Sequence, residues 1–161
     1  MLYPDTVRPL TQNDIPDVLE LYTGNPEYFA YCPPPPSEAT VRADMLALPP
    51  AKEMRDKHFI GFYAKDRLAA VMDLIDRYPD DETALIGLLM VNRNWQGKGV
   101  GAYIVQRISE ALRAQGFRRI RIGVIKTNLR ARSFWRKQGF CAIGNALLDE
   151  NASVIIAEKQ L

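Results

Sequence analysis

Residues 90–102 read MVNRNWQGKGVGA, and in them a predicted buried strand passes through a glycine-rich loop straight into a predicted helix. Glycines allow the backbone of such a loop to approach an oxyanion closely. The first N–H groups of a helix lack intrahelical partners, and the helix dipole favours negative charge at the same end. The stretch therefore predicts a binding site for a phosphate-bearing ligand.

Three designs of phosphate-binding loop share this arrangement, and residue spacing separates them. A P-loop requires Ser or Thr after its lysine, whereas the lysine here precedes a glycine. A dinucleotide fingerprint is met in form by Gly97, Gly99 and Ala102, but no acidic residue ends the next strand and a hairpin precedes the loop. The third design, Q-x-x-G-x-G, fits Gln96, Gly99 and Gly101.

A second motif begins 32 residues after Gln96, where residues 128–140 read NLRARSFWRKQGF. It combines an Asn, an aromatic pair and a Gly-Phe ending. The two motifs, in this order on the predicted elements, resemble the GNAT superfamily of acyl-CoA-dependent N-acetyltransferases over roughly residues 55–160. The blocks AVMDLI at residues 70–75 and WQGKG at residues 95–99 are similar to small bacterial members of unassigned substrate.

The resemblance implies an acetyl-CoA site and a role for each matching residue. The strand end at Leu89, Met90 and Val91 would offer backbone groups to the pantetheine arm, and the Met90 N–H would polarise the thioester carbonyl. Asn128 and Ser133 would hydrogen-bond the pantetheine arm. The loop residues expected to wrap the pyrophosphate are Gln96, Gly97, Lys98, Gly99, Val100, Gly101 and Ala102.

Two positions depart from the family pattern. Trp135, which belongs to the expected cofactor site, stands where many members carry the tyrosine that protonates the departing thiolate, and an indole N–H does not give up its proton near neutral pH. Gly87 stands where many members carry a glutamate base. We therefore expect an acceptor amine of low pKa, or a base acting through water, for which Asp73 is the assigned candidate and Asp76 and Asp80 are alternatives.

Charge differs between the two halves of the sequence. Residues 1–82 hold 8 Lys+Arg against 15 Asp+Glu, whereas residues 83–161 hold 13 against 4. The acidic half favours a cationic acceptor, a primary amine of a small molecule or peptide, with Tyr28, Tyr31 and Asp73 as candidate contacts. Nine basic residues and no acidic one lie within residues 113–137, which matches the three phosphates of CoA or, alternatively, a solvated basic face.

Hydrophobic periodicity predicts helices and strands in a mixed order. Helices are expected over residues 11–24, from 37 to about 48, over 99–114 and over 128–138; strands are expected at 58–64, 68–75, 83–91, 119–125 and 151–158. This order indicates the α/β class, as an α+β mixed sheet, in a single domain over residues 1–161. The resemblance implies a GNAT-like, mostly antiparallel central sheet with a splayed strand pair and helices on both faces. Cys141 is expected to be buried on a core strand.

Composition excludes several classes of protein. The chain has 47% hydrophobic and 25% charged residues with a net charge of +2, as in a soluble globular protein. The longest uncharged apolar stretch, residues 83–92, is too short to span a membrane, and the first residues lack a signal peptide's basic start, so we expect a cytoplasmic protein without a membrane partner. Two distant cysteines and one histidine, His58, predict neither a disulfide nor a metal site.

Two other functions remain alternatives. A non-catalytic module of the same fold that binds CoA or acetyl-CoA is motivated by Trp135 and Gly87. A nucleic-acid-binding protein is disfavoured, because the arginines lack the interleaved aromatic residues of single-strand binders. A homodimer is compatible with the sequence.

Overall fold

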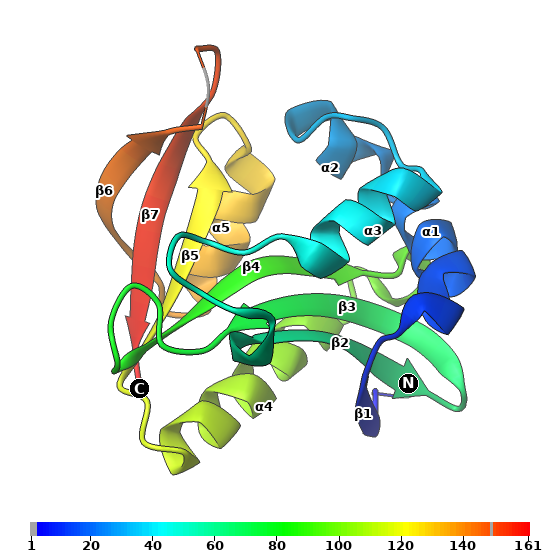
Figure 1. Cartoon of the computed structure of the whole chain (residues 1–161), viewed down its shortest axis with the longest axis horizontal. Helices are drawn as coiled ribbons and strands as arrows, with labels where there is room; N and C mark the ends of the chain where they lie inside the picture. Colours follow the sequence, from blue (N-terminus) through cyan, green and yellow to red (C-terminus); the bar gives the residue numbers. More distant parts are fainter. Residues whose placement is uncertain (1–2, 149) are drawn as a thin grey trace. The chain divides into compact units, whose positions relative to one another are not determined.

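A computed structural model describes residues 3–148 and 150–161 and contains one mixed sheet. Its strands are β1 (Thr6–Pro9), β2 (Lys57–Ala64), β3 (Arg67–Ile75), β4 (Thr83–Val91), β5 (Arg119–Ile125), β6 (Cys141–Leu147) and β7 (Ser153–Gln160). Its α-helices are α1 (Ile15–Thr23), α2 (Pro26–Tyr31), α3 (Glu38–Leu46), α4 (Val100–Ala114) and α5 (Leu129–Lys137). The strand order is β1-β2-β3-β4-β5-β7-β6 (Figure 1).

The direction of pairing changes at the centre of the sheet. β4 and β5 pair in parallel, whereas β1–β2, β5–β7 and β6–β7 pair antiparallel. The β4–β5 register joins Thr83, Ala84, Leu85 and Ile86 to the first four residues of β5, and β4 continues through Val91 beyond this paired stretch. The expected fold class, a mixed and mostly antiparallel sheet with helices, is confirmed.

The chain divides into two compact units. The first contains Met1–Leu74 and Leu88–Tyr103, and the second contains Ile75–Gly87 and Ile104–Leu161. The expectation of a single domain stays a prediction.

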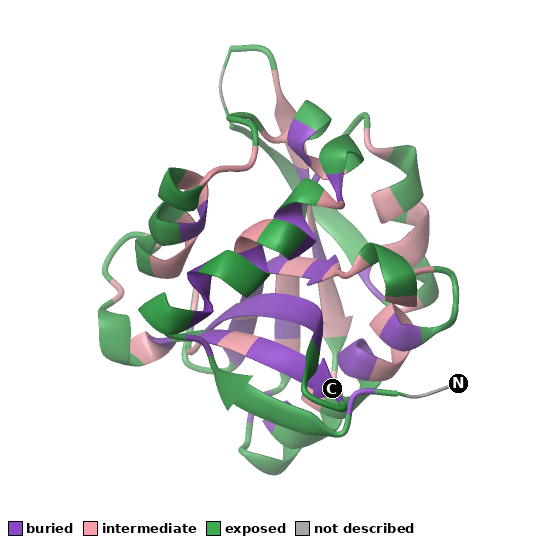
Figure 2. Ribbon diagram, turned by 90° about the vertical axis from the view of Figure 1, so that its right-hand side faces the viewer, coloured by how far each residue is buried: buried purple, intermediate pink, exposed green. Residues whose placement is uncertain are grey.

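In the first unit, three helices pack on the strands that carry its core (Figure 1). The spacing of Ile15, Val18 and Tyr22 brings them to one side of α1, so that all three are buried. The core cluster joins α1, Phe29 of α2 and Val41 of α3 to side chains of β2, β3 and β4. In Figure 2 the buried residues lie along these strands, whereas the edge strand β1 is exposed throughout.

In the second unit, β5 alternates as the sequence predicts. Ile120, Ile122 and Val124 are buried, and the residues between them are half-buried or exposed. β7 lies between β5 and β6, which leaves β6 at the edge of the sheet. The helix α4 is followed by Gly116, whose φ of 96° suits the residue just after a helix.

The expectation for Cys141 is wrong. Cys141 is the first residue of β6, every residue of which is exposed, because the strand has a sheet neighbour on one side only. Among the residues that the structure describes, no helix is both long enough and apolar enough to cross a membrane.

Candidate active site

The glycine-rich loop begins where β4 is fastened to its neighbour. The Asn92 backbone N–H donates to the Ala69 carbonyl at 2.7 Å, and its side-chain amide donates to the Leu68 carbonyl at 3.1 Å. Asn92 Oδ1 also accepts the Asn94 N–H at 3.0 Å, which starts the short 3-10 helix Arg93–Trp95. One asparagine therefore fixes both the end of the strand and the direction of the loop.

Left-handed backbone at two glycines shapes the loop itself. Gly97 has φ of 72° and Gly99 has φ of 80°, and a Cβ built on Gly97 meets no atom within 4 Å. Backbone conformation, not lack of space, therefore requires glycine here. Gly97, Lys98 and Gly99 are exposed, and the Tyr103 N–H bonds the Gly99 carbonyl at 3.0 Å in the first turn of α4. The loop thus leads its exposed backbone into the N-terminus of a 15-residue helix.

The Gln96 side chain has a structural role that the sequence did not reveal. Its Nε2 donates to Asn25 Oδ1 at 2.5 Å and to the Val91 carbonyl at 2.9 Å. Asn25 Nδ2 donates to the same Val91 carbonyl at 3.1 Å and to the Leu21 carbonyl at 2.9 Å. Two side-chain amides thus join the loop, the end of β4 and the turn after α1. They occupy the carbonyl of Val91, one of the three residues expected to offer backbone groups to pantetheine.

The other two residues of the strand end differ in exposure. Met90 is 4% exposed, and its side chain belongs to the core cluster, whereas Leu89 is half-buried. Since the Met90 side chain is in the core, only its backbone is available for the expected contact with the thioester.

In the second unit, Asn128 caps α5. Its Oδ1 accepts the Ala131 N–H at 3.1 Å, and the expected contact of Asn128 with pantetheine stays a prediction. Ser133 is half-buried in the same helix. Trp135 is also half-buried and makes edge-to-face contacts with Phe134 and Phe140, each at 5.0 Å between ring centroids. Ring packing accounts for an aromatic residue at this position.

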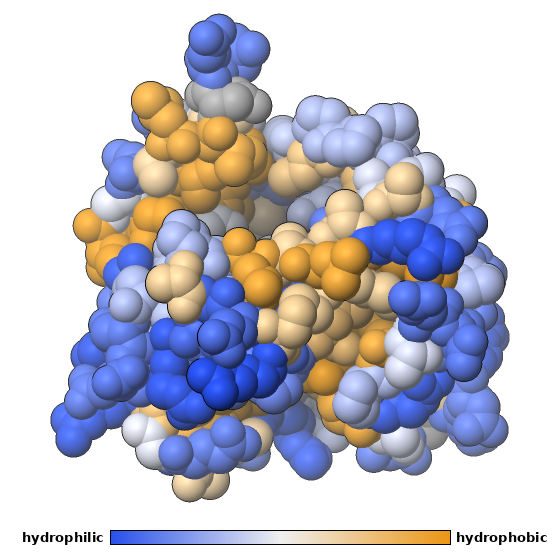
Figure 3. All heavy atoms as spheres, viewed as in Figure 1, coloured by the Kyte–Doolittle hydropathy of each residue, from blue (hydrophilic) through white to orange (hydrophobic). Residues whose placement is uncertain are grey.

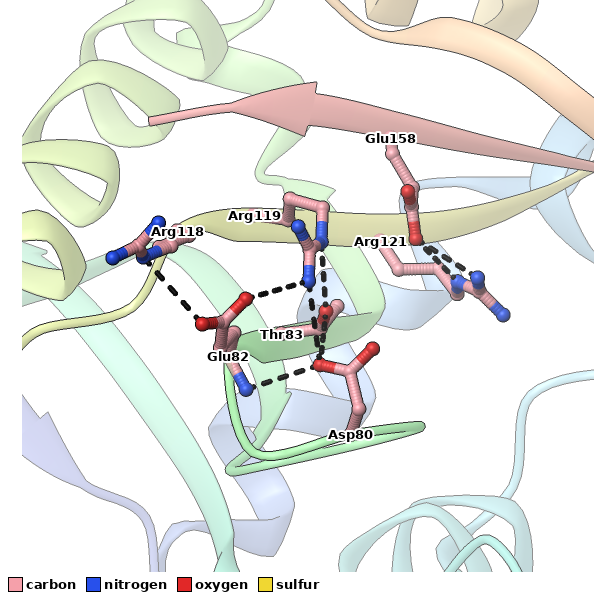
Figure 4. Close-up of polar contacts among 7 residues, drawn as sticks. All are labelled: Asp80, Glu82, Thr83, Arg118, Arg119, Arg121 and Glu158. Carbon is pink, nitrogen blue, oxygen red and sulfur yellow. Dashed lines mark hydrogen bonds and ion pairs between the residues drawn. The ribbon is translucent and has the colours of Figure 1, made fainter.

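Part of the basic cluster is neutralised by acids (Figure 4). Glu82 pairs with Arg119 at 3.0 Å and with Arg118 at 3.5 Å, and Glu158 accepts from Arg121 Nε at 2.9 Å. These three arginines are therefore paired with acids, and the expectation that the run of nine basic residues serves CoA phosphates stays a prediction. Within the described part of the chain, the members of the run without an ion pair are Arg113, Lys126, Arg130, Arg132, Arg136 and Lys137.

The family described as "Acetyltransferase (GNAT) family" matches residues 17–140. The chain belongs to the GNAT acetyltransferase family. No curated protein matches its sequence.

Solved structures share this GNAT fold over nearly the whole chain. An acetyltransferase from Thermus thermophilus has a TM-score of 0.80 at 24% identity, covering 99% of this chain and 100% of its own. The ribosomal-protein-S18-alanine N-acetyltransferase of Escherichia coli has a TM-score of 0.70 at 16% identity, covering 96% of this chain and 92% of its own. PaiA N-acetyltransferase from Thermoplasma acidophilum, solved with coenzyme A, has a TM-score of 0.70 at 18% identity, covering 97% and 98%.

The acidic candidates of this GNAT chain differ in surroundings. Asp80 accepts from Thr83 Oγ1 at 2.8 Å, and this hydrogen bond lowers the pKa of Asp80, which makes it a weak base. Asp73 is only 9% exposed, and Lys57 Nζ donates to its Oδ2 at 2.9 Å. Burial raises the pKa of Asp73, and the Lys57 charge opposes that rise.

The two candidate tyrosines lie at different depths. Tyr28 packs against the core cluster that contains Met90, and burial raises the pKa of its hydroxyl. Tyr31 is 38% exposed at the end of α2. The structure therefore brings Tyr28, but not Tyr31, into the cluster that includes Met90. In residues 3–148 and 150–161, no three His, Cys, Asp or Glu side chains are grouped to hold a metal ion.

Proposed function

We propose that this protein transfers an acetyl group from acetyl-CoA to a primary amine of a small molecule or peptide, by direct attack within a ternary complex. One observation carries the proposal: exposed glycine backbone with φ of 72° and 80° leads into the N-terminus of α4, directly after the end of β4. A related fold, PaiA from Thermoplasma acidophilum, has been solved with coenzyme A.

The residues assigned to acetyl-CoA have distinct roles. Acetyl-CoA supplies an activated thioester, whose carbonyl carbon accepts the amine while the thiolate leaves. Backbone N–H groups of residues 97–102 bind the pyrophosphate, and the Met90 N–H donates to the thioester oxygen. The free amide nitrogen of Asn128 and the Ser133 hydroxyl hydrogen-bond the pantetheine arm, beside Trp135.

A covalent route through Cys32 is disfavoured. Cys32 is half-buried, and burial raises the pKa of its thiol, so the thiol stays protonated near neutral pH. The raised pKa therefore argues against an acetylated Cys32 as an intermediate, in keeping with the proposed direct attack.

The glutamate that takes the proton of the attacking amine in many family members is absent here, so the pKa of the amine decides how much of it is neutral. A lysine-type amine, with pKa about 10.4, is less than about 0.1% neutral at pH 7, whereas an α-amine near 7.8 is about 10% neutral. The departing thiolate is the conjugate base of a thiol with pKa about 8.5, so it is an adequate leaving group without a general acid. Asp73 remains the candidate base from the sequence, and a pH profile of kcat/KM unchanged in Asp73→Asn would remove it from that role.

A non-catalytic acetyl-CoA-binding module is the second candidate. Two observations favour it: Trp135 is held by ring contacts rather than positioned as an acid, and Gly87 has no side chain to act as a base.

Thiol release over a panel of amines separates the two candidates. The panel contains α-amino compounds, alkyl amines and peptides, and mass spectrometry identifies the acetylated product. Release of thiol together with an acetylated amine supports the enzyme. Acetyl-CoA binding without thiol release across the panel supports the module.

A further inference from the structure

Four polar side chains from four elements of the first unit form a cluster, which we call the acidic cluster. It consists of Tyr22 on α1, Asp44 on α3, Lys57 at the start of β2 and Asp73 on β3. The Tyr22 hydroxyl donates to Asp44 Oδ2 at 2.7 Å. Lys57 Nζ donates to Asp73 Oδ2 at 2.9 Å and to the Ala47 carbonyl at 2.7 Å.

With Asp44, Asp73 and Lys57 ionised, the acidic cluster carries a net charge of about minus one. Two carboxylates face a single ammonium, and Lys57 is the cation that lowers the pKa of both carboxylates. Burial raises the pKa of Asp44 and of Asp73, and the Asp44 charge raises the pKa of Asp73 further. Uncompensated charge in a half-buried place is costly, so the cluster suits one additional cation.

A second, independent observation concerns hydrogen bonding. Asp73 Oδ1 is buried and accepts no hydrogen bond from any described residue, although Asp73 itself is 9% exposed. An unpaired buried acceptor costs about 1–3 kcal/mol, and more when it is charged. Such groups are rare in folded proteins and point to a ligand, an ion or a function. A donor that carries positive charge would satisfy both the charge and the oxygen.

The acidic cluster also adjoins the strand that the proposed reaction uses. Tyr22 is fully buried and belongs to the core cluster that contains Met90 and receives Tyr28. An acceptor held by Asp44 and Asp73 therefore lies beside the core cluster to which Met90 belongs.

We propose that the acidic cluster binds a cationic group of the acceptor, an ammonium or a guanidinium, that is separate from the amine to be acetylated. This inference rests on the proposed function and adds the substrate class: an amine that carries a second cation. The held group is not the reacting amine, because a net negative site stabilises the protonated form, whereas attack on a thioester requires the neutral one. In this assignment Asp73 binds the second cation and does not act as the base.

Calorimetric titration of the CoA-saturated protein compares matched ligands. Cadaverine has an ammonium at each end of a five-carbon chain, and pentylamine keeps one amine on the same chain. Agmatine has an ammonium and a guanidinium at the ends of a four-carbon chain. We expect cadaverine, agmatine or both to bind at least about tenfold more tightly than pentylamine. Whichever of the two binds better tells which cation the cluster prefers.

Two variants of the full chain test the assignment. Asp44→Asn keeps an acceptor for the Tyr22 hydroxyl and removes the charge, so we expect it to lose most of the preference for the second cation. Asp66→Asn, in the exposed turn between β2 and β3, is the matched control and keeps the preference. In turnover, Asp44→Asn should raise KM for cadaverine by about tenfold, while kcat changes less.

Different results would overturn the proposed function and the role of the acidic cluster. Absence of CoA binding overturns the proposed function. CoA binding with equal affinities for cadaverine, agmatine and pentylamine, or with no affinity for any of them, overturns only the acidic cluster as an acceptor site. The same preference in Asp44→Asn as in the native chain also overturns it. Asp44→Asn is the main variant because Asp73→Asn leaves the buried Lys57 unpaired and endangers folding.

Discussion

At the scale of single residues, two side-chain amides position the end of β4. The Val91 carbonyl accepts from both Asn25 and Gln96, and Asn25 Oδ1 in turn accepts from Gln96. Asn25 is 8% exposed, so water replaces its hydrogen bonds poorly.

Removing the Asn25 amide should therefore loosen the cofactor loop. Asn25→Ala leaves the Gln96 amide with one partner fewer, and we expect KM for acetyl-CoA to rise about tenfold. Steady-state kinetics with varied acetyl-CoA measures this, and Asn13→Ala at an exposed position of the same unit is the control. An unchanged KM in Asn25→Ala would show that this network does not support the site.

The ion pair between Arg8 and Asp14 makes the stability of the fold depend on pH. The Arg8 guanidinium lowers the pKa of Asp14, which also accepts the Thr11 N–H at 2.7 Å. A carboxylate whose pKa is lowered by folding stabilises the fold above its unfolded pKa of about 3.9, and this contribution disappears as pH falls through the folded value. Asp14→Asn should melt a few degrees below the native chain at neutral pH, and the difference should shrink in acid. Circular dichroism melts at both pH values measure it; an equal difference at both would contradict the assignment.

At the scale of elements, the loop between β4 and α4 depends on left-handed backbone. Gly99 has φ of 80°, and a Cβ there would meet only the Tyr3 hydroxyl, at 3.5 Å. Gly99→Ala therefore introduces strain without a clash, of about 1–2 kcal/mol. If the loop changes its shape to relieve this strain, we expect acetyl-CoA to bind about tenfold more weakly. If the loop keeps its shape, we expect a lower melting temperature. Gly144→Ala is the control, because φ there is not positive and a Cβ meets nothing within 4 Å. Equal behaviour of the two variants would argue against the left-handed loop.

The elements also show what a single sequence can and cannot predict. The strands at 58–64, 83–91 and 119–125 were found within a residue of their bounds, because burial on a sheet leaves a clear hydrophobic pattern. β1 and α2 were missed, and of β6 only Cys141 was placed on a strand, which was expected in the core. β1 and β6 are exposed throughout and carry no such pattern, and α2 has only six residues.

For the candidate site, the same limit applies to long-range contacts. The loop and the start of the helix at residue 128 were predicted, because each is local in sequence. The partner of Gln96 lies 71 residues away in the sequence. The pairing of Glu82 with Arg118 and Arg119 joins the acidic half of the sequence to the basic half. Asp80 and Glu82 belong to the second unit, so the acidic and basic halves of the sequence do not coincide with the two units.

At the scale of the whole molecule, the edge strand β6 bears on assembly. Ile143 and Leu147 on β6 are 54% and 80% exposed, and the adjoining Leu148 is 61% exposed. Figure 3 shows apolar side chains gathered at the upper left, over β6 and β7. Exposed apolar edge strands pair readily with other chains.

The homodimer considered from the sequence is therefore expected to use β6. Ile143→Lys places a charge on this edge, whereas Val7→Lys changes the exposed edge strand β1 and serves as the control. Light scattering should give the mass of two chains for the native protein and for Val7→Lys, and of one chain for Ile143→Lys. A native mass of one chain, or the same mass in all three, would contradict this expectation.

The central claim is that the loop after β4 receives the phosphates of acetyl-CoA, and calorimetric titration of the native chain with acetyl-CoA tests it most directly. The account predicts binding of one acetyl-CoA per chain, with a dissociation constant in the micromolar range, and weaker binding by Gly99→Ala than by Gly144→Ala. Absence of binding by the native chain would contradict the account.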